Sequence, residues 1–149
     1  LYCGTGTIGI ILSDLFKQIK GVDSFPSSIQ NAKQNAQLNS INNAEYFLDK
    51  AEDWLDGQQI SEQDFIIVDP PRKGLDKTLI NTLNQSKASN LIYVSCHPGT
   101  LSRDLKLLKD EWQIKVIQPI DMFPWTMHIE CIVWIQKKNR IIPVTRYNN

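Results

Sequence analysis

Four features of the sequence have residue types that could do chemistry. The glycine-rich stretch Gly4–Gly9 reads GTGTIG, Asp23 follows it, Asp69 opens DPPRKG, and Cys96 stands in SCHPG. A cysteine can add to an electron-poor carbon as a thiolate, and a carboxylate can take up or release a proton. Whether these residues form one site depends on the elements that carry them.

The glycine-rich stretch matches the pattern G-x-G-x-x-G between an expected strand and an expected helix. Glycine lets the backbone turn tightly and approach a ligand closely. Asp23 ends the next expected strand, at a spacing typical of a carboxylate that binds ribose hydroxyls. A tight turn with a surface aspartate would explain the same residues, but the strand–loop–helix context favours nucleotide binding. The motif does not choose between a dinucleotide and S-adenosylmethionine.

Asp69 ends another expected strand, and ligands of open α/β sheets bind outside such ends. Pro70 and Pro71 restrict the backbone, so the loop leaves the strand in a fixed direction. Arg72 and Lys73 either face a phosphate backbone or are solvated charges of a stiff turn. The motif resembles the Pro-Pro-aromatic loop of methyltransferases that act on exocyclic amines. Because Arg72 replaces the aromatic residue, methylation of an amino group is disfavoured.

Cys96 follows an expected strand and precedes an expected helix with Thr100 as its N-cap. Most cysteines at strand ends are small buried apolar residues. A position just before a helix N-terminus, however, favours the thiolate. Methylation of uracil at C5 needs a thiolate, because its addition to C6 makes C5 nucleophilic, and a base must then remove the C5 proton. We therefore interpret Cys96 as a nucleophile.

The elements that carry these residues alternate between short apolar runs and amphipathic stretches, which is typical of a parallel sheet covered by helices. The expected strands are 1–3, Ile19–Asp23, Ala44–Leu48, Phe65–Asp69 and Asn90–Ser95. The expected helices are Ile8–Lys17, Ser27–Asn39, Ala51–Leu55, Lys77–Leu83 and Thr100–Lys109. The runs Ile114–Ile120 and His128–Ile135 are joined by so short a connection that they must be antiparallel. The pattern predicts a doubly wound, mostly parallel seven-stranded α/β sheet of the Rossmann-like methyltransferase type, closed by an antiparallel hairpin.

The composition fits one soluble globular domain, with 149 residues and 42% hydrophobic side chains. Sixteen basic and sixteen acidic residues cancel, so the net charge gives no support for a nucleic-acid partner. Three widely spaced cysteines without Cys-x-x-Cys argue against a disulfide framework or a zinc site and favour a cytoplasmic setting. No apolar run suits a membrane span. Because the chain opens on Leu1 at the end of a strand, we expect a fragment that lacks an N-terminal part.

Four blocks of the sequence, in order, resemble the RNA uracil-5-methyltransferase family, which makes 5-methyluridine in ribosomal or transfer RNA. The blocks are LYCGTGTIG, VDPPRKGL, YVSCHPGTLSRDL and DMFPWTMHIECIVWI. The resemblance implies S-adenosylmethionine as the cofactor and RNA as the substrate, with ribosomal RNA preferred to transfer RNA. It also implies a catalytic domain over 1–136, followed by a polar tail over 137–149. We expect a monomer without a metal or a membrane partner.

By this resemblance, Cys96 attacks C6 and Glu130 removes the C5 proton. Sequence position alone would not single out Glu130, because a glutamate near the start of an alternating strand ordinarily faces solvent. The resemblance implies cofactor contacts for Tyr2, Gly4, Gly6, Thr7, Asp23 and Asp69. It implies substrate contacts for Arg72, His97 and His128.

Two other readings stay open on the residues alone. An NAD(P)-binding oxidoreductase would explain the glycine-rich stretch and Asp23, but it leaves Cys96 and Glu130 without a role. A catalytically silent module that binds S-adenosylmethionine or RNA would keep the fold without turnover.

Overall fold

The computed structural model describes residues 1–122, 124–126 and 128–138, and within these ranges six strands form two sheets. The strands are β1 (Ile19–Asp23), β2 (Ala44–Leu48), β3 (Phe65–Val68), β4 (Asn90–Ser95), β5 (Trp112–Ile120) and β6 (Glu130–Lys137). The helices are α1 (Thr7–Ile11), the 3-10 helix η1 (Ser13–Leu15), α2 (Pro26–Leu38), α3 (Ala51–Asp56), α4 (Lys77–Gln85) and α5 (Pro98–Leu108).

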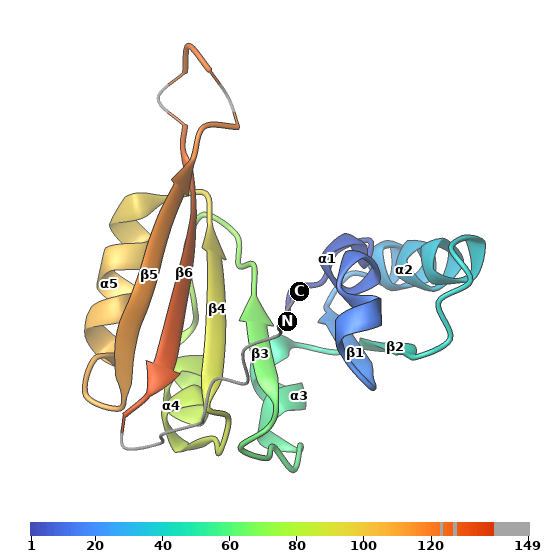
Figure 1. Ribbon diagram of the computed structural model, residues 1–149, viewed down its shortest axis with the longest axis horizontal. Coiled ribbons are helices and arrows are strands. Elements are labelled where there is room, and N and C mark those ends of the chain that lie inside the picture. The colour runs from blue at the N-terminus through green and yellow to red at the C-terminus, as the bar shows by residue number, and fades with distance from the viewer. Residues whose placement is uncertain (123, 127, 139–149) are drawn as a thin grey trace, which may run out of the picture.

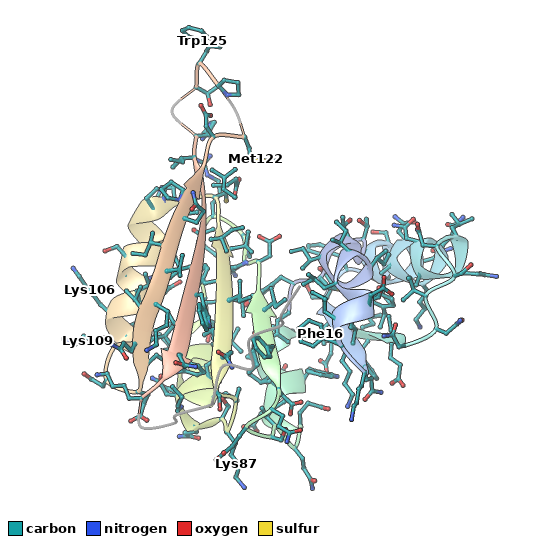
Figure 2. All side chains as sticks on the ribbon, viewed as in Figure 1. Phe16, Lys87, Lys106, Lys109, Met122 and Trp125 are labelled. Carbon is teal, nitrogen blue, oxygen red and sulfur yellow. The ribbon has the colours of Figure 1, made fainter. Side chains whose placement is uncertain are left out.

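The larger sheet has the strand order β3-β4-β6-β5, and the smaller sheet pairs β1 with β2 (Figure 1). β3 and β4 are parallel, as are β1 and β2, whereas β6 runs antiparallel to both β4 and β5. The short connection between β5 and β6 thus makes the antiparallel pair that its length predicts. Its loop projects beyond the sheet, with the fully exposed Trp125 at its tip (Figure 2).

Residues 1–3 join the two sheets. The main-chain nitrogen of Leu1 donates to the carbonyl of Ile67 in β3 (2.7 Å), and the Cys3 N–H donates to the carbonyl of Val22 in β1 (2.9 Å). Tyr2 between them has a φ of 59°, so this segment turns out of the sheet before it can form a ladder. The expected first strand and the continuous seven-stranded sheet are therefore wrong in detail: a two-stranded and a four-stranded sheet are bridged by three residues.

The predicted boundaries of β1, β2 and β4 are confirmed to the residue, and those of most helices differ by one or two residues. Two expectations about helices were wrong. The helix expected to reach Lys17 ends at Ile11, and η1 follows it. The N-cap of α5 is His97 rather than Thr100, because the Nδ1 atom of His97 accepts the Thr100 N–H.

The main core lies between the four-stranded sheet and helices α3, α4 and α5. Its fully buried side chains include Leu79, Leu83, Leu91, Tyr93 and Val133. A second, smaller core packs α2 against Tyr46 of β2. Each sheet is thus held by its own apolar cluster, and the strand ends that could bind ligands lie at the edges of these clusters.

Lys137, which was expected to open the polar tail, is the buried last residue of β6. Its ammonium donates to the carbonyls of Leu83 and Asn84 in the last turn of α4 and lies 4.7 Å from the ring centroid of Trp112. A cation at a helix C-terminus is favourable because the free carbonyls there carry partial negative charge. β6 therefore extends one residue beyond position 136. Residues 139–149 of the expected tail lie outside the described residues.

Candidate functional site

Asp23 holds the glycine-rich loop in place. One carboxylate oxygen accepts the Gly4 N–H (2.9 Å), and the other accepts the Phe25 N–H (3.0 Å). Both Gly4 and Gly6 have positive φ, at 52° and 83°, which glycine adopts without strain. Because a carboxylate has about four lone-pair sites, Asp23 can bind further donors, such as ribose hydroxyls.

The glycine loop packs against Tyr46 at Gly6 and is open at Gly4. A Cβ on Gly6 would lie 2.8 Å from the hydroxyl of Tyr46, and a Cβ on Gly21 would lie 2.5 Å from a ring carbon of the same tyrosine. A Cβ on Gly4 would have nothing within 4 Å. The backbone at Gly4 is thus accessible to a ligand, while Tyr46 fixes the loop from the other side. These features fit a nucleoside-containing cofactor.

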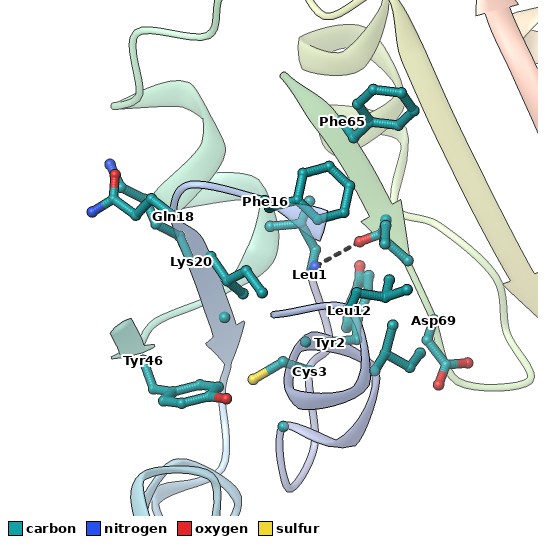
Figure 3. A pocket seen from close by; sticks show the side chains of 16 residues that line it. Leu1, Tyr2, Cys3, Leu12, Phe16, Gln18, Lys20, Tyr46, Phe65 and Asp69 are labelled. Atoms are coloured by element: carbon teal, nitrogen blue, oxygen red, sulfur yellow. Dashed lines mark hydrogen bonds between the residues drawn. The ribbon is translucent and has the colours of Figure 1, made fainter. Parts of the chain in front are cut away.

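A pocket lies beside this loop, in the slot between β1 and β3 that residues 1–3 cross (Figure 3). Tyr2, Cys3, Tyr46 and Asp69 line it together with apolar side chains such as Phe65. Burial raises the pKa of Tyr2 to about 12, so its hydroxyl stays protonated at neutral pH. Neither Cys96 nor Glu130 lines this pocket. The pocket therefore belongs to the glycine-loop side of the site and not to its thiol.

Asp69 directly follows β3, with its side chain exposed and its N–H donating to the carbonyl of Leu1 (3.3 Å). Partial loss of solvent around this carboxyl raises its pKa. The following loop makes a turn in which the Gly74 N–H donates to the carbonyl of Pro71 (2.8 Å). Arg72 is exposed beside this turn. The loop leaves β3 in one defined direction, as the two prolines predict.

Cys96 directly follows β4, and Glu130 is the first residue of the adjacent strand β6. Ser95, the last residue of β4, pairs with Cys131 of β6 in antiparallel register. Continuing this register by one residue sets Cys96 opposite Glu130, and directly opposite residues point to the same face of a sheet. Both residues are half-buried.

Asp69 lies close to this pair. The pKa of Glu130 is raised above its ordinary value, first by partial burial and then by the negative charge of Asp69. Since β4 lies between β3 and β6, the order across this end of the sheet is Asp69, Cys96, Glu130. Two carboxyl groups thus flank one thiol.

Cys3 and Cys131 are the other two cysteines of the chain. Burial raises the pKa of Cys3 to about 11, and burial also raises the pKa of Cys131, so both remain thiols at neutral pH. All three cysteines are free. Cys3 and Cys131 therefore pack as small apolar groups.

The three residues predicted to contact the substrate, Arg72, His97 and His128, lie in three different loops. His97 adjoins Cys96, and because its Nδ1 accepts the Thr100 N–H, the ring proton resides on Nε2, where it can be donated to a ligand. His128 is exposed in the β5–β6 loop, where its N–H donates to Thr126 Oγ1 (3.2 Å). Thr7 is exposed at the first residue of α1.

One functional candidate was missed in the sequence. Asp104 falls on the apolar stripe of α5 with Leu101 and Leu108, and its side chain is fully buried. A carboxylate on such a stripe must have partners inside the protein, because burial without hydrogen bonds is costly. The helical spacing of Leu101, Asp104 and Leu108 was the signal that could have predicted this burial. The partners of Asp104 are described below.

Among the described residues, no cluster of three or more His, Cys, Asp or Glu side chains is arranged to hold a metal ion. Within the same ranges, no helix has the length and apolar character needed to cross a membrane.

Comparison with known proteins adds a family and a fold. The family model described as tRNA (uracil-5-)-methyltransferase matches residues 1–138. An uncharacterized RNA methyltransferase of Listeria innocua is 47% identical over 141 residues, which are 92% of this chain and 30% of that protein. An uncharacterized RNA methyltransferase of Halalkalibacterium halodurans is 44% identical over 142 residues, 93% of this chain and 31% of that protein. The chain thus spans about a third of the length of these relatives.

A crystal structure of Pyrococcus abyssi tRNA (uracil-54, C5)-methyltransferase with S-adenosyl-L-homocysteine superimposes with a TM-score of 0.79 and 36% identity, covering 90% of this chain and 32% of that one. An rRNA methylase of Streptococcus thermophilus superimposes with a TM-score of 0.72 at 15% identity, covering 91% of this chain and 82% of that one. The second likeness shows the Rossmann-like methyltransferase fold alone.

Proposed function

The chain belongs to the tRNA (uracil-5-)-methyltransferase family, and on this premise we propose that it is the catalytic domain of an S-adenosylmethionine-dependent enzyme that methylates C5 of uracil in RNA. The observation that carries the proposal is the order Asp69, Cys96, Glu130 across the ends of three neighbouring strands. This arrangement offers a nucleophile and a base side by side.

The reaction needs covalent help because C5 of uracil is a poor nucleophile. The Cys96 thiolate adds to C6, which forms an S–C6 bond and makes C5 enolate-like. S-adenosylmethionine, when bound, supplies the methyl group that C5 takes up. Glu130 then removes the proton from C5, and the electrons of that C–H bond restore the C5–C6 double bond as the thiolate leaves. Glu130 then releases this proton to solvent, and with the departure of S-adenosylhomocysteine the enzyme returns to its starting state.

The raised pKa of Glu130 suits this role. A carboxylate whose pKa lies above the ordinary value is a stronger base than an ordinary carboxylate. Asp69 supplies part of that shift. The basicity of Glu130 therefore depends in part on Asp69, whose carboxyl group lies on the cofactor side.

The cofactor is assigned to the glycine-loop side. Asp23 would bind the ribose, and the open backbone at Gly4 and the exposed Asp69 would face the rest of the molecule. Tyr2, Gly6 and Thr7 complete this set as the family resemblance implies. The family match favours this assignment over the NAD(P) reading.

The RNA substrate is assigned to the side of the thiol. Arg72, His97 and His128 are the contacts that we assign to it, with His97 Nε2 as a hydrogen-bond donor beside Cys96. Between the two RNA classes, we prefer ribosomal RNA. The protein is proposed to act in the cytoplasm as a monomer.

The test is methyl transfer itself. The protein, with S-adenosylmethionine labelled in its methyl group, is incubated with transcribed ribosomal RNA and with transfer RNA, and the digested nucleosides are identified by mass spectrometry. The proposal expects labelled 5-methyluridine, which Cys96→Ala abolishes and the control Cys131→Ala retains. Labelled methyl groups on another atom would contradict the proposal, and binding of cofactor and RNA without transfer would favour the silent module.

A further inference from the structure

A buried carboxylate on α5 ties that helix to the loop that follows β3. Oδ2 of Asp104 accepts the Leu75 N–H (2.8 Å) and the hydroxyl of Tyr93 in β4 (2.7 Å). Oδ1 accepts Nε of Arg103 (2.8 Å), and the guanidinium also forms an ion pair with it (2.7 Å). Asp104 and Tyr93 are fully buried. A buried polar network with every member satisfied is rigid.

Side chains of α5 form hydrogen bonds with the loop after β3 at two further points. Thr100 Oγ1 donates to the carbonyl of Arg72 (3.1 Å), and Nη2 of Arg103 donates to the carbonyl of Lys73 (2.8 Å). Three of the four residues from Arg72 to Leu75 are therefore bonded to α5.

Gly74 is the remaining residue, and its place shows how near α5 lies. It has a φ of +77°, and a Cβ there would lie 2.5 Å from Asp104 Oδ2 and 2.6 Å from Nη2 of Arg103. Only glycine fits at position 74, because a Cβ there would overlap this ion pair. The loop and the helix thus form one body.

This body spans both halves of the proposed site. The loop begins immediately after Asp69, on the cofactor side, while α5 begins immediately after His97 and Cys96, on the uracil side. Tyr93 lies three residues before Cys96 in β4. Asp104 is bonded to each of these elements, although it does not reach the reacting atoms.

We propose that Asp104 is a positioning residue: together with Tyr93 and Arg103, it sets the Asp69 loop relative to Cys96 so that the methyl donor meets the covalently held uracil. The inference rests on the proposed function. A misplacement of about 1 Å at a reacting centre costs about 100-fold in rate. Loss of the Asp104 carboxylate is therefore expected to act on methyl transfer.

Cofactor affinity distinguishes a positioning role of Asp104 from a purely structural role. The glycine loop and Asp23 belong to the β1 side of the site, and none of the Asp104 hydrogen bonds reaches them. A purely structural role would lower stability, cofactor binding and turnover together. A positioning role lowers kcat by far more than it weakens the binding of S-adenosylhomocysteine, because the glycine loop and Asp23 keep their places.

The experiment compares Asp104→Asn and Tyr93→Phe with Leu83→Ala, a change in the same core in a side chain of α4. Tyr93→Phe keeps the bond from Leu75 to Asp104 and removes one hydroxyl, so it provides a gentler variant should Asp104→Asn fold poorly. We expect kcat to fall about 100-fold in Asp104→Asn and about tenfold in Tyr93→Phe, with a much smaller rise in the cofactor Kd, because Asp69 is only one of several cofactor contacts. Leu83→Ala should lower Tm without this selective loss of kcat. Losses of kcat that simply follow Tm in all three variants, or a cofactor Kd that rises in step, would overturn the proposal.

A second readout needs no turnover. Hydrogen exchange measured by mass spectrometry should accelerate over residues 70–76 in Asp104→Asn and stay unchanged there in Leu83→Ala. The single amide oxygen of Asn cannot replace both carboxylate oxygens, so either the Leu75 N–H or Arg103, which both hold this loop, loses its acceptor only in the first variant. Unchanged exchange in Asp104→Asn contradicts the proposal whether or not the protein methylates RNA. An inactive parent protein with accelerated exchange would count against the proposed function alone.

Discussion

Partial burial, and then the negative charge of Asp69, raise the pKa of Glu130, although Asp69 and Glu130 lie at the ends of β3 and β6, with β4 between them. Cys96 follows β4 and therefore lies in the gap that the two carboxyl groups flank. The catalytic proposal depends on this relationship, because it couples the basicity of one carboxylate to the charge of the other. It also makes the pH dependence of the reaction testable.

Turnover should fall as pH falls through the raised pKa of Glu130, because the base works only when it is deprotonated. Asp69→Asn removes the charge that disfavours ionisation, so the pKa of Glu130 should fall and the acid limb of the rate profile should move to lower pH. The measurement is kcat against pH at saturating S-adenosylmethionine. An acid limb that stays in place, or moves to higher pH, would contradict the coupling.

Glu130→Gln should separate the two halves of the reaction. The nucleophile and the methyl transfer remain, but the C5 proton cannot be removed, so turnover should fall about 100- to 10,000-fold. Methylated RNA should then accumulate as a covalent adduct on the protein, visible by denaturing electrophoresis with labelled cofactor. If the variant turns over normally, another group is the base. Glu111→Gln, at the opposite end of the β5–β6 pair from Glu130, is the matched control.

Asp23→Asn should weaken cofactor binding. The amide has only one acceptor oxygen, so it cannot hold both the Gly4 and the Phe25 N–H and also bind ribose. Loss of one charge-assisted hydrogen bond corresponds to about 1.5–3 kcal/mol, or roughly a tenfold to hundredfold higher Kd. Calorimetric titration with S-adenosylhomocysteine measures it. A Kd equal to that of the parent protein would remove Asp23 from the site.

Gly6→Ala and Gly4→Ala form a matched pair. Both positions have positive φ, so alanine costs about 1 kcal/mol of folding stability at either. At Gly6 the added methyl also meets the Tyr46 hydroxyl, which should raise the cost to about 2–4 kcal/mol. Urea unfolding of the two variants measures the difference. Equal losses would show that Tyr46 does not support the loop.

Much of the fold could be predicted because its signals are local. The continuous apolar run of β4 and the turn residues around β1 and β2 set those boundaries to the residue. One failure is non-local, because the pairing of residues 1–3 with two different sheets depends on strands far along the chain. The other is local: His97 replaces Thr100 as the cap because its ring folds back onto the helix.

The residues of the candidate site also divide into those with a local sequence signal and those without one. The glycine loop, Asp69 and Cys96 were visible as motifs at strand ends, whereas Glu130 came only from the family resemblance. Its place opposite Cys96 depends on the register of β6 with β4, which no local pattern encodes. Asp104 was missed because a single acidic residue in an amphipathic helix is ordinarily solvated, and only its burial reveals the network.

The most direct test of the central claim uses a short RNA that contains 5-fluorouridine. Fluorine at C5 cannot leave as a proton does, so the reaction should stop with the base bound to the protein. With S-adenosylmethionine present, we predict a covalent adduct that denaturing mass spectrometry locates at Cys96 and that Cys96→Ala abolishes while Cys3→Ala retains it. An adduct on another residue would contradict the account, because the thiolate of Cys96 would then not be the nucleophile.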